Sequence, residues 1–459
     1  MTRQIRKALI PFGISCAFVA AACSGEGAGT GAPDTNGSAT PDADETMLPT
    51  APESQRVDLE PPVFSDPTTV DNPLFPISGL HSALLLGNVE GHPLRIETTL
   101  LPDHKVIDLD GEEIETLASQ FVAYLDGRIH EVALDWYGQS DDGSVWYFGE
   151  DVFNYEDGVV ADTDGTWLAG ADGPVAMIMP ADPQVGDVYR PENIPDSIFE
   201  EVTVTSIGLT VNGPRGPVDG AIIGEELHLL EGYYEDKIFA PGYGEFASGV
   251  DGSLETLAIA VPTDALSDPV PPELQVLTDG AIAVVDAVEA DDWPAAAATL
   301  DEMRIAWSTH GEGRQVPENL AIQMDRAMDA LAGDALSPAV DARNGIGASN
   351  AALDVLQASL DLQLQYRPPV EIDRERFVGW TRQLVVDVGG AEPEPGNIAG
   401  DVTTLEWIWD RIADTFDDGG DVETLLDDLR TAADEEDAEA AADAATDLFQ
   451  LVERIRPQS

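Results

Sequence analysis

The chain has 459 residues, of which 87 are acidic and 22 basic, and its formal net charge is −65. Because phosphate contacts need clustered Lys and Arg, this balance argues against nucleic acid as a partner and against docking on anionic lipid through a basic patch. Hydrophobic residues make up 43% of the chain, so global disorder is not expected, and the length allows two or three domains. The acidic residues are spread along the whole chain, so we interpret the charge as a surface property.

Residues 1–22 are predicted to be a lipoprotein signal peptide. Arg3, Arg6 and Lys7 precede an apolar stretch, residues 8–22, that is too short and too broken for a good spanning helix. The small residues before Cys23 resemble the bacterial lipobox, which implies that Cys23 is diacylated on its sulfur and becomes the mature N-terminus. The alternative is an ordinary secretory signal that is cut at the same place. We predict a lipid anchor at Cys23 that holds the protein on the extracytoplasmic face of the cell membrane, or on the outer membrane of a host with two membranes.

Residues 23–71 are predicted to be an acidic tether. They are rich in Gly, Ala, Thr, Pro and acidic residues and contain few large apolar side chains, so they cannot bury a core of their own. The chain has two cysteines, Cys16 in the signal peptide and Cys23 at the lipidation site. The mature body is therefore expected to lack disulfides, thiol chemistry and Cys-based metal sites, and no cofactor is predicted.

Residues 72–268 have the pattern of an antiparallel β domain. Asp126-Gly127 joins two β-rich runs, 121–125 and 128–136, in the form of a hairpin with a two-residue turn. Further Asp-Gly pairs begin at positions 142, 157 and 164. Other predicted strands cover 96–101, 203–211, 221–230, 237–240 and 255–261. Strands joined by such turns indicate an antiparallel meander.

Three motifs in this region carry a resemblance to a known family. They are DNPLFP at 71–76, DWY at 135–137 and DGSVWYFGED at 142–151, followed by GTW at 165–167, MP at 179–180, VGDVY at 185–189 and APGYG at 240–244. Together they resemble the signature of a family of uncharacterised, actinobacterial-type lipoproteins. The likeness covers residues 71–262 and departs from the family at 79–93, where the family has aromatic residues in its first strand. It implies an envelope β domain and no catalytic activity.

Residues 269–459 are predicted to form a helical bundle, because the apolar period changes to about 3.6 residues. The expected helices cover 273–290, 293–309, 317–332, 337–365, 373–389, 399–416, 421–432 and 434–456. Similar apolar positions recur after about 101 residues, so the bundle is predicted to contain two repeats, 273–365 and 373–456. The fold class is therefore an α+β multidomain protein with an antiparallel β-meander domain followed by an all-α helical bundle domain.

No metal site is predicted. The six histidines contain no pair at i,i+3 or i,i+4 and no H-E-x-x-H motif. The loops around Gly143 and Gly165 lack the acidic residues that a calcium loop of the EF type needs at its first and last positions.

The candidate binding residues are aromatic and acidic side chains in the β region: Trp136, Tyr137, Trp146, Tyr147, Glu150 and Asp151. Carboxylates beside aromatic rings are typical of glycosidase sites, although turn acids at a strand end give the same pattern. No catalytic residue is assigned. The leading hypothesis is a non-catalytic envelope lipoprotein that binds an unknown envelope protein or small ligand. The alternatives are an envelope hydrolase that uses β-domain carboxylates, and capture of a metal or solute by the helical domain.

Overall fold

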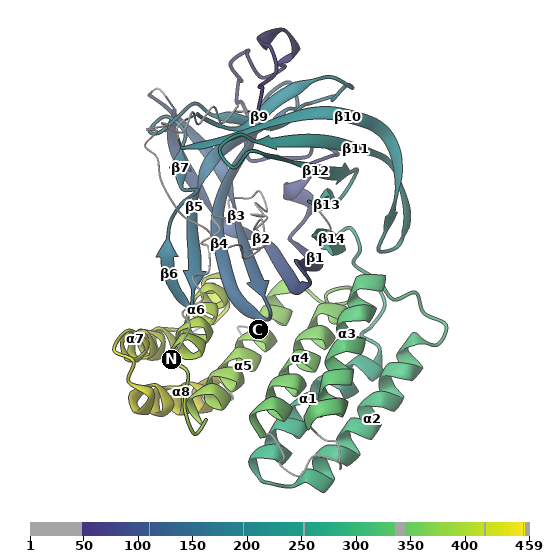
Figure 1. Ribbon diagram of the computed structural model, residues 1–459, viewed down its shortest axis with the longest axis vertical. Helices are drawn as coiled ribbons and strands as arrows, with labels where there is room; N and C mark the ends of the chain where they lie inside the picture. Colours follow the sequence, from purple (N-terminus) through teal and green to yellow (C-terminus); the bar gives the residue numbers. More distant parts are fainter. Residues whose placement is uncertain are drawn as a thin grey trace, which may run out of the picture.

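The computed structural model describes residues 48–459 except 110, 196, 251–252, 336–344, 417–418, 453 and 455–459. The signal peptide, Cys23 and the first half of the expected tether lie outside these residues. Within the described part of the chain, fourteen strands form one sheet and are followed by eight α-helices (Figure 1). All paired strands are antiparallel, so the predicted fold class is confirmed.

The sheet is a meander with one long-range closure. Its order is β6-β5-β4-β3-β2-β1-β14-β13-β12-β11-β10-β9, so neighbours in the sheet are neighbours in the chain except where β1 pairs with β14. The strands are β1 (Ser82–Val89), β2 (His92–Leu109), β3 (Glu112–Leu125), β4 (Arg128–Gln139), β5 (Val145–Glu156), β6 (Val159–Asp162), β7 (Trp167–Leu168), β8 (Ala176–Met179), β9 (Val188–Ile194), β10 (Ile198–Gly213), β11 (Gly216–His228), β12 (Tyr233–Ala240), β13 (Gly244–Gly249) and β14 (Leu254–Val261). The predicted hairpin between β3 and β4 turns at Asp126 and Gly127, whose φ angles of 51° and 77° match a primed turn.

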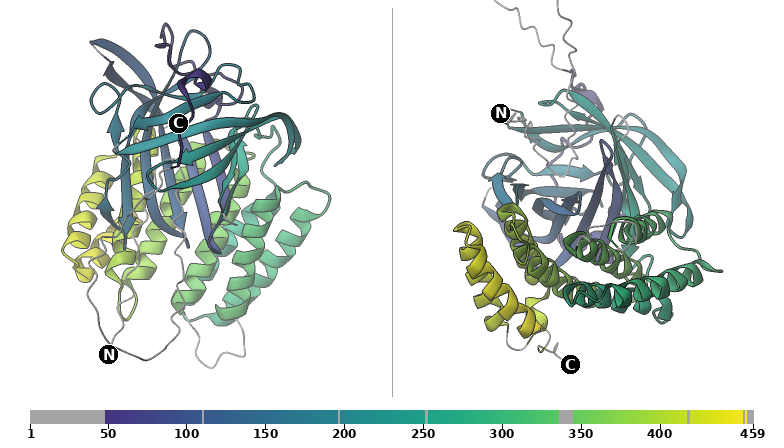
Figure 2. Two further views of the ribbon diagram at one scale, coloured as in Figure 1. Left: turned by 45° about the horizontal axis from the view of Figure 1, so that its top comes forward. Right: turned by 60° about the horizontal axis from the view of Figure 1, so that its bottom comes forward.

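The sheet curls around an interior. Strands β7 and β8 both pair with β5, and β8 also lies against β9, so the two ends of the strand order approach each other. Because successive side chains on a strand point to opposite faces, each strand has one row of side chains in this interior and one row outside. The views in Figure 2 show the strongly curved strands above the helices.

The helices form two groups. They are α1 (Pro272–Glu289), α2 (Trp293–Gly311), α3 (Glu318–Ala330), α4 (Gly345–Gln363), α5 (Pro369–Val388), α6 (Pro395–Ile412), α7 (Gly420–Asp434) and α8 (Ala438–Val452). Helices α1 to α4 share one hydrophobic cluster and helices α5 to α8 another, and α4 packs on α5. The sequence repeat itself stays a prediction. In the part of the chain that the structure describes, no helix has the length and apolar character needed to span a membrane.

The helices form a curved layer against the outer face of the sheet (Figure 2). Helix α3 contacts β1 and β14, and α6 contacts β4 and β6. Leu84 of β1 and Ile259 of β14 belong to the same buried cluster as Leu277 of α1. Farther along, the ring of Tyr124 stacks on that of Trp380 with 5.8 Å between centroids. Apolar contacts therefore join the β domain to the bundle at both places.

A buried cluster of charges lies in the same interface. Glu97 on β2 contacts three guanidinium groups, at 2.6 Å from Arg95, 3.3 Å from Arg376 and 2.6 Å from Arg411. Asp361 on α4 accepts hydrogen bonds from Arg95 and Arg376 at 2.7 Å. Because buried charges need well-placed partners, this cluster fixes how the helices sit on the sheet.

The end of the tether needs a correction. It was expected to extend to residue 71, but Val70 is fully buried and the ring of Phe64 packs on that of Phe148 at 5.2 Å. The backbone N–H of Val57 also donates to the carbonyl of Val188 at 2.9 Å. Although Val57, Leu59 and Val63 stay exposed, the segment packs on the β domain through Phe64 and Val70, and from about residue 56 it is part of that domain.

Candidate functional site

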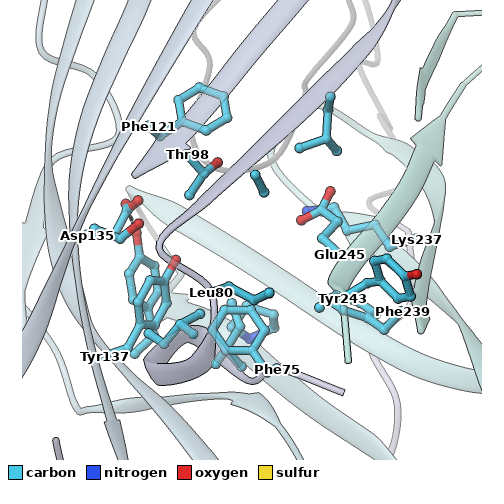
Figure 3. A pocket seen from close by; sticks show the side chains of 18 of the residues that line it. Phe75, Leu80, Thr98, Phe121, Asp135, Tyr137, Lys237, Phe239, Tyr243 and Glu245 are labelled. Carbon is cyan, nitrogen blue, oxygen red and sulfur yellow. Dashed lines mark hydrogen bonds between the residues drawn. The ribbon is translucent and has the colours of Figure 1, made fainter. Parts of the chain in front are cut away.

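A cavity of about 120 Å³ lies in the interior of the curled sheet. Figure 3 shows Asp135 and Tyr137 on one side of it, Lys237 and Glu245 on the other side, and Phe75 nearby. The aromatic residues that line it are Phe75, Phe121, Tyr137, Tyr147, Tyr189, Phe239 and Tyr243. The side chains come from the segment before β1, from β1 to β5 and from β8 to β14, so the cavity exists only because the sheet curls.

The lining of the cavity is strongly acidic. Its carboxyl residues are Asp135, Glu192, Glu200, Glu226, Glu245 and Glu255, and among the described residues Lys237 is the sole Lys or Arg that lines it. Three more buried carboxyl residues interact with these side chains: Glu131, Glu150 and Glu235. The interpretation of the charge as a surface property is therefore wrong in part, because several acids of the β domain point inward.

The wall formed by β4 and β5 holds a carboxyl group against two phenol rings. Tyr147 donates a hydrogen bond from its hydroxyl to Oδ1 of Asp135 at 2.9 Å, and its ring stacks on Tyr137 at 4.9 Å. Burial raises the pKa of Asp135 to about 8. A bulge at Gly149, with φ of 114°, brings β5 close to Trp167; a Cβ atom there would lie 2.2 Å from the Trp167 carbonyl oxygen. Glycine is therefore required at this position.

Neighbouring acids on this side of the cavity lack cationic partners among the described residues. Burial and the nearby Asp135 raise the pKa of Glu150 well above its usual range, and both of its carboxyl oxygens are buried with no hydrogen-bond partner among the described residues. Burial and the neighbouring Glu200 and Glu150 raise the pKa of Glu192 as well. Both oxygens of Glu131 are buried with no hydrogen-bond partner among the residues that the structure describes, and burial raises its pKa as well.

The wall formed by β10 to β12 contains the two bases of the interior. His228 lies with Nδ1 at 3.2 Å from Glu200, and with Nε2 at 3.5 Å from both Glu226 and Glu235. Lys237 places its Nζ 2.7 Å from Oε2 of Glu226. Burial disfavours the charged imidazole, but the surrounding carboxylates raise the pKa of His228 to about 10. These bases neutralise part of the acidic wall.

The interior can therefore hold protons or bind cations. Nine buried or half-buried carboxyl groups face two bases, and a medium of low dielectric cannot hold such an excess of ionised acids. Aromatic faces beside the acids add attraction for a cation. The arrangement favours recognition of positive charge.

Half of the sequence-predicted site residues reach this interior. Tyr137 and Tyr147 line the cavity, and Glu150 is fully buried beside it. They come from adjacent strands, β4 and β5, whose register pairs Tyr137 with Tyr147. The structure thus brings these three side chains together.

The other predicted residues lie elsewhere. Trp136 packs in the hydrophobic core and Nζ of Lys105 stands 3.4 Å from the centroid of its ring. Trp146 donates from its indole nitrogen to Oγ of Ser144 at 2.8 Å. Asp151 is half-exposed and lies 3.8 Å from Lys105. Adjacent residues of a strand face opposite sides, so the contiguous motifs could not all contribute to one site.

Sequence reasoning missed the acids of β9 to β12. The signal was present in two pairs at i,i+2, Glu226 with His228 and Glu235 with Lys237, because such pairs share one face of a strand. The spacings i,i+3 and i,i+4, which are typical of helices, do not include such strand pairs. Glu200, on the neighbouring strand, joins them only through the β10–β11 register, in which it is the partner of His228.

Two comparisons with known proteins give no indication of the function of the chain. A scan against protein-family models finds no match for the chain, and a search of curated proteins finds none either.

Proposed function

We propose that this protein is a lipid-anchored envelope protein that binds a small organic cation in the cavity of its β domain. The observation that carries the proposal is the charge of the lining, with six carboxyl residues against Lys237 around a set of aromatic rings. Carboxylates accept hydrogen bonds from an ammonium group, and aromatic faces attract its charge and pack on its carbon atoms. An amine satisfies both parts of this lining.

The size of the cavity limits the ligand. A volume of about 120 Å³ is close to that of an apolar cavity of roughly 150 Å³ that holds benzene. An amine with a compact carbon body, such as a short primary amine or a quaternary ammonium, fits this volume. Apolar contacts from Leu80, Leu85 and Phe121 favour such a body over a fully hydrated ion.

Binding of a cation is expected to depend on pH. Burial raises the pKa of Asp135 to about 8, and burial and the surrounding acids raise that of Glu245 to about 7, although Lys237 acts in the opposite direction. A cation binds the ionised carboxylates, so its binding releases protons. Affinity is therefore expected to rise between pH 6 and pH 8.5.

The location is proposed from the N-terminal sequence. Arg3, Arg6 and Lys7, the apolar stretch and Cys23 support a lipid anchor on the extracytoplasmic face of the membrane. Replacement Cys23→Ser is expected to abolish labelling by a fatty-acid probe and to release the protein from membranes. Unchanged fatty-acid labelling and unchanged membrane retention of the variant would contradict the lipid anchor. Such a result would not bear on the proposed binding of a cation, which is tested separately.

The binding test compares a cation with its neutral isostere. Isothermal titration of the full chain with choline is expected to show binding, and 3,3-dimethylbutan-1-ol, which has the same shape without the charge, is expected to bind at least tenfold more weakly. Glu245→Gln should weaken choline binding, and Asp236→Asn, an exposed change on β12, should not. Equal binding of both compounds, or no binding of either, would refute the proposal.

A further inference from the structure

We infer that Glu200, Glu226 and His228 form a site for one divalent transition-metal ion in the wall of the β domain. The inference does not rest on the binding of an organic cation. It concerns the corner between β10 and β11, where the three side chains are buried and each offers one ligand atom. These atoms all lie within 4.8 Å of one another.

The distances are close to those of a metal site. Bonds of about 2.0–2.2 Å from a metal to its ligands place donor atoms about 3.4 Å apart in a tetrahedral site and at most about 4.4 Å apart across an ion. Side-chain rotations that bring the three donors together by up to about 1.4 Å would therefore close them around an ion. Glu200 and Glu226 are both buried, so an ion bound between them would be shielded from bulk water.

Both ring nitrogens of His228 lie near carboxylates, so the imidazole is positioned to act as a metal ligand beside an acidic neighbour. Its Nδ1 lies 3.2 Å from Glu200, whereas its Nε2 has the oxygens of Glu226 and Glu235 at 3.5 Å, too far for good hydrogen bonds. A separation of about 3.5 Å is typical of two ligands on one small ion. The ring of Tyr233 stacks on the imidazole at 4.4 Å and fixes its orientation.

Two buried polar groups beside the trio point to a missing ligand. Oε1 of Glu235 and the hydroxyl of Tyr189 are buried and have no hydrogen-bond partner among the described residues. Burial, and after it the charge of Glu226, raises the pKa of the Tyr189 hydroxyl. Such groups normally find partners, so water molecules on a bound metal would satisfy both of them.

The charge balance and the donor set indicate the class of metal. Four carboxylates surround this corner (Glu200, Glu226, Glu235 and Glu245), and Lys237 supplies one positive charge. With a neutral imidazole as ligand, a divalent ion raises the positive charge to three. One imidazole with two carboxylates suits Zn²⁺ or Mn²⁺, whereas Ca²⁺ prefers six or more oxygen ligands.

The strands preorganise the three ligands. Glu226 and His228 are two residues apart on β11 and so share a face, and β10 pairs Glu200 with His228 across the ladder. Donors on strands of a sheet keep their spacing better than donors on loops.

The test measures metal directly on the full chain after treatment with EDTA and dialysis. Elemental analysis after equilibration with Zn²⁺ or Mn²⁺ is expected to find one equivalent per chain, and Ca²⁺ at the same concentration is expected to leave none. Titration with Co²⁺ should give visible absorption bands of an ion with imidazole and carboxylate ligands. His228→Gln is expected to weaken binding at least tenfold.

A matched control is available in a second His–Glu pair. His104 lies 2.8 Å from Glu115 on the exposed part of the sheet, so His104→Gln should leave metal binding unchanged. Glu226→Gln, which keeps the side-chain shape, serves as a second variant if His228→Gln does not fold. No stoichiometric metal in the wild-type chain, or wild-type affinity in the folded variant, would overturn the inference whatever the result with choline.

Discussion

Replacing Glu97 by Gln tests whether the buried charge cluster holds the sheet and the helices together. The carboxylate contacts Arg95 of its own strand and Arg376 and Arg411 of two helices. Burial alone would raise the pKa of Glu97, but the three guanidinium groups hold it far below its usual range. Glutamine keeps the shape of the side chain and removes its charge.

The expected loss of stability is about 3–5 kcal/mol, the usual cost of removing one partner from a buried ion pair. The side chain of Glu97 is 3% exposed, so water cannot replace the lost charge. After the change, three guanidinium groups share the carboxylates of Asp361 and Asp373. Glu115→Gln is the control, because Glu115 is 59% exposed and pairs only with His104 among the described residues. A surface pair of this kind contributes about 0–1 kcal/mol.

Urea unfolding followed by circular dichroism measures both variants at pH 7. The pKa of Glu97 is lowered on folding, so the stability it contributes is present above its unfolded value of about 4.3 and is lost as the pH falls toward the folded value. The gap between wild type and Glu97→Gln should therefore shrink in acid. A loss of less than 1 kcal/mol at pH 7, or a gap that stays constant in acid, would refute the reasoning.

Two further predictions concern the interior and the contact between the domains. The pKa of Asp135 is raised to about 8, so its contribution to stability is present below its unfolded value of about 3.9 and is lost as the pH rises to 8. In the wild type this group should lower the free energy of unfolding by roughly 1 kcal/mol per pH unit between pH 5 and pH 8, and Asp135→Asn should abolish that slope. Urea unfolding at several pH values measures the slope, and an unchanged slope in the variant would contradict the prediction. Gly158 has a φ of 76°, and a Cβ atom there would lie 2.2 Å from the backbone nitrogen of Gly400. Gly158→Ala should therefore cost at least about 2 kcal/mol more than Gly127→Ala, which has a similar φ and open space around it; equal losses would show that the close approach is unimportant.

The local parts of the fold could be predicted because their signals are local. The Asp126-Gly127 turn and its flanking strands, and the helices with a period of 3.6, depend on residues that are near in sequence. The closure of β1 on β14 pairs Ser82 with Val261, and the charge cluster joins Glu97 to Arg411. Such contacts have no local pattern, so the curl of the sheet and the helical layer on it could not be derived from the sequence.

The candidate site was half predicted for the same reason. The motif around 146–151 directed attention to β5, where Tyr147 and Glu150 do face the interior. The bulge at Gly149 lets these two side chains, three residues apart, share one face, whereas their neighbours Trp146 and Asp151 face away. The acids of β10 to β12 carry no motif, and only the register of three strands brings them to the cavity.

Lys237, one of the two lysines outside the signal peptide, supports the interpretation of the interior as a place for positive charge. Lys105 stands over the ring of Trp136, and Lys237 lies among carboxylates in the cavity wall. In a chain with three lysines and 87 acids, one ammonium group is therefore already part of this wall. Its position shows that the interior accommodates an ammonium between acids and aromatic rings, which is the environment that the proposed ligand requires. Lys237 pairs with Oε2 of Glu226, the same atom that lies 3.5 Å from His228, so a metal on Glu226 and His228 would displace the ammonium group of Lys237. An organic cation would instead use Asp135 and Glu245 of the cavity lining. The two sites can then be separated by titrating choline with and without Zn²⁺: independent sites leave the number of bound choline molecules unchanged, and competition would place both cations in one site.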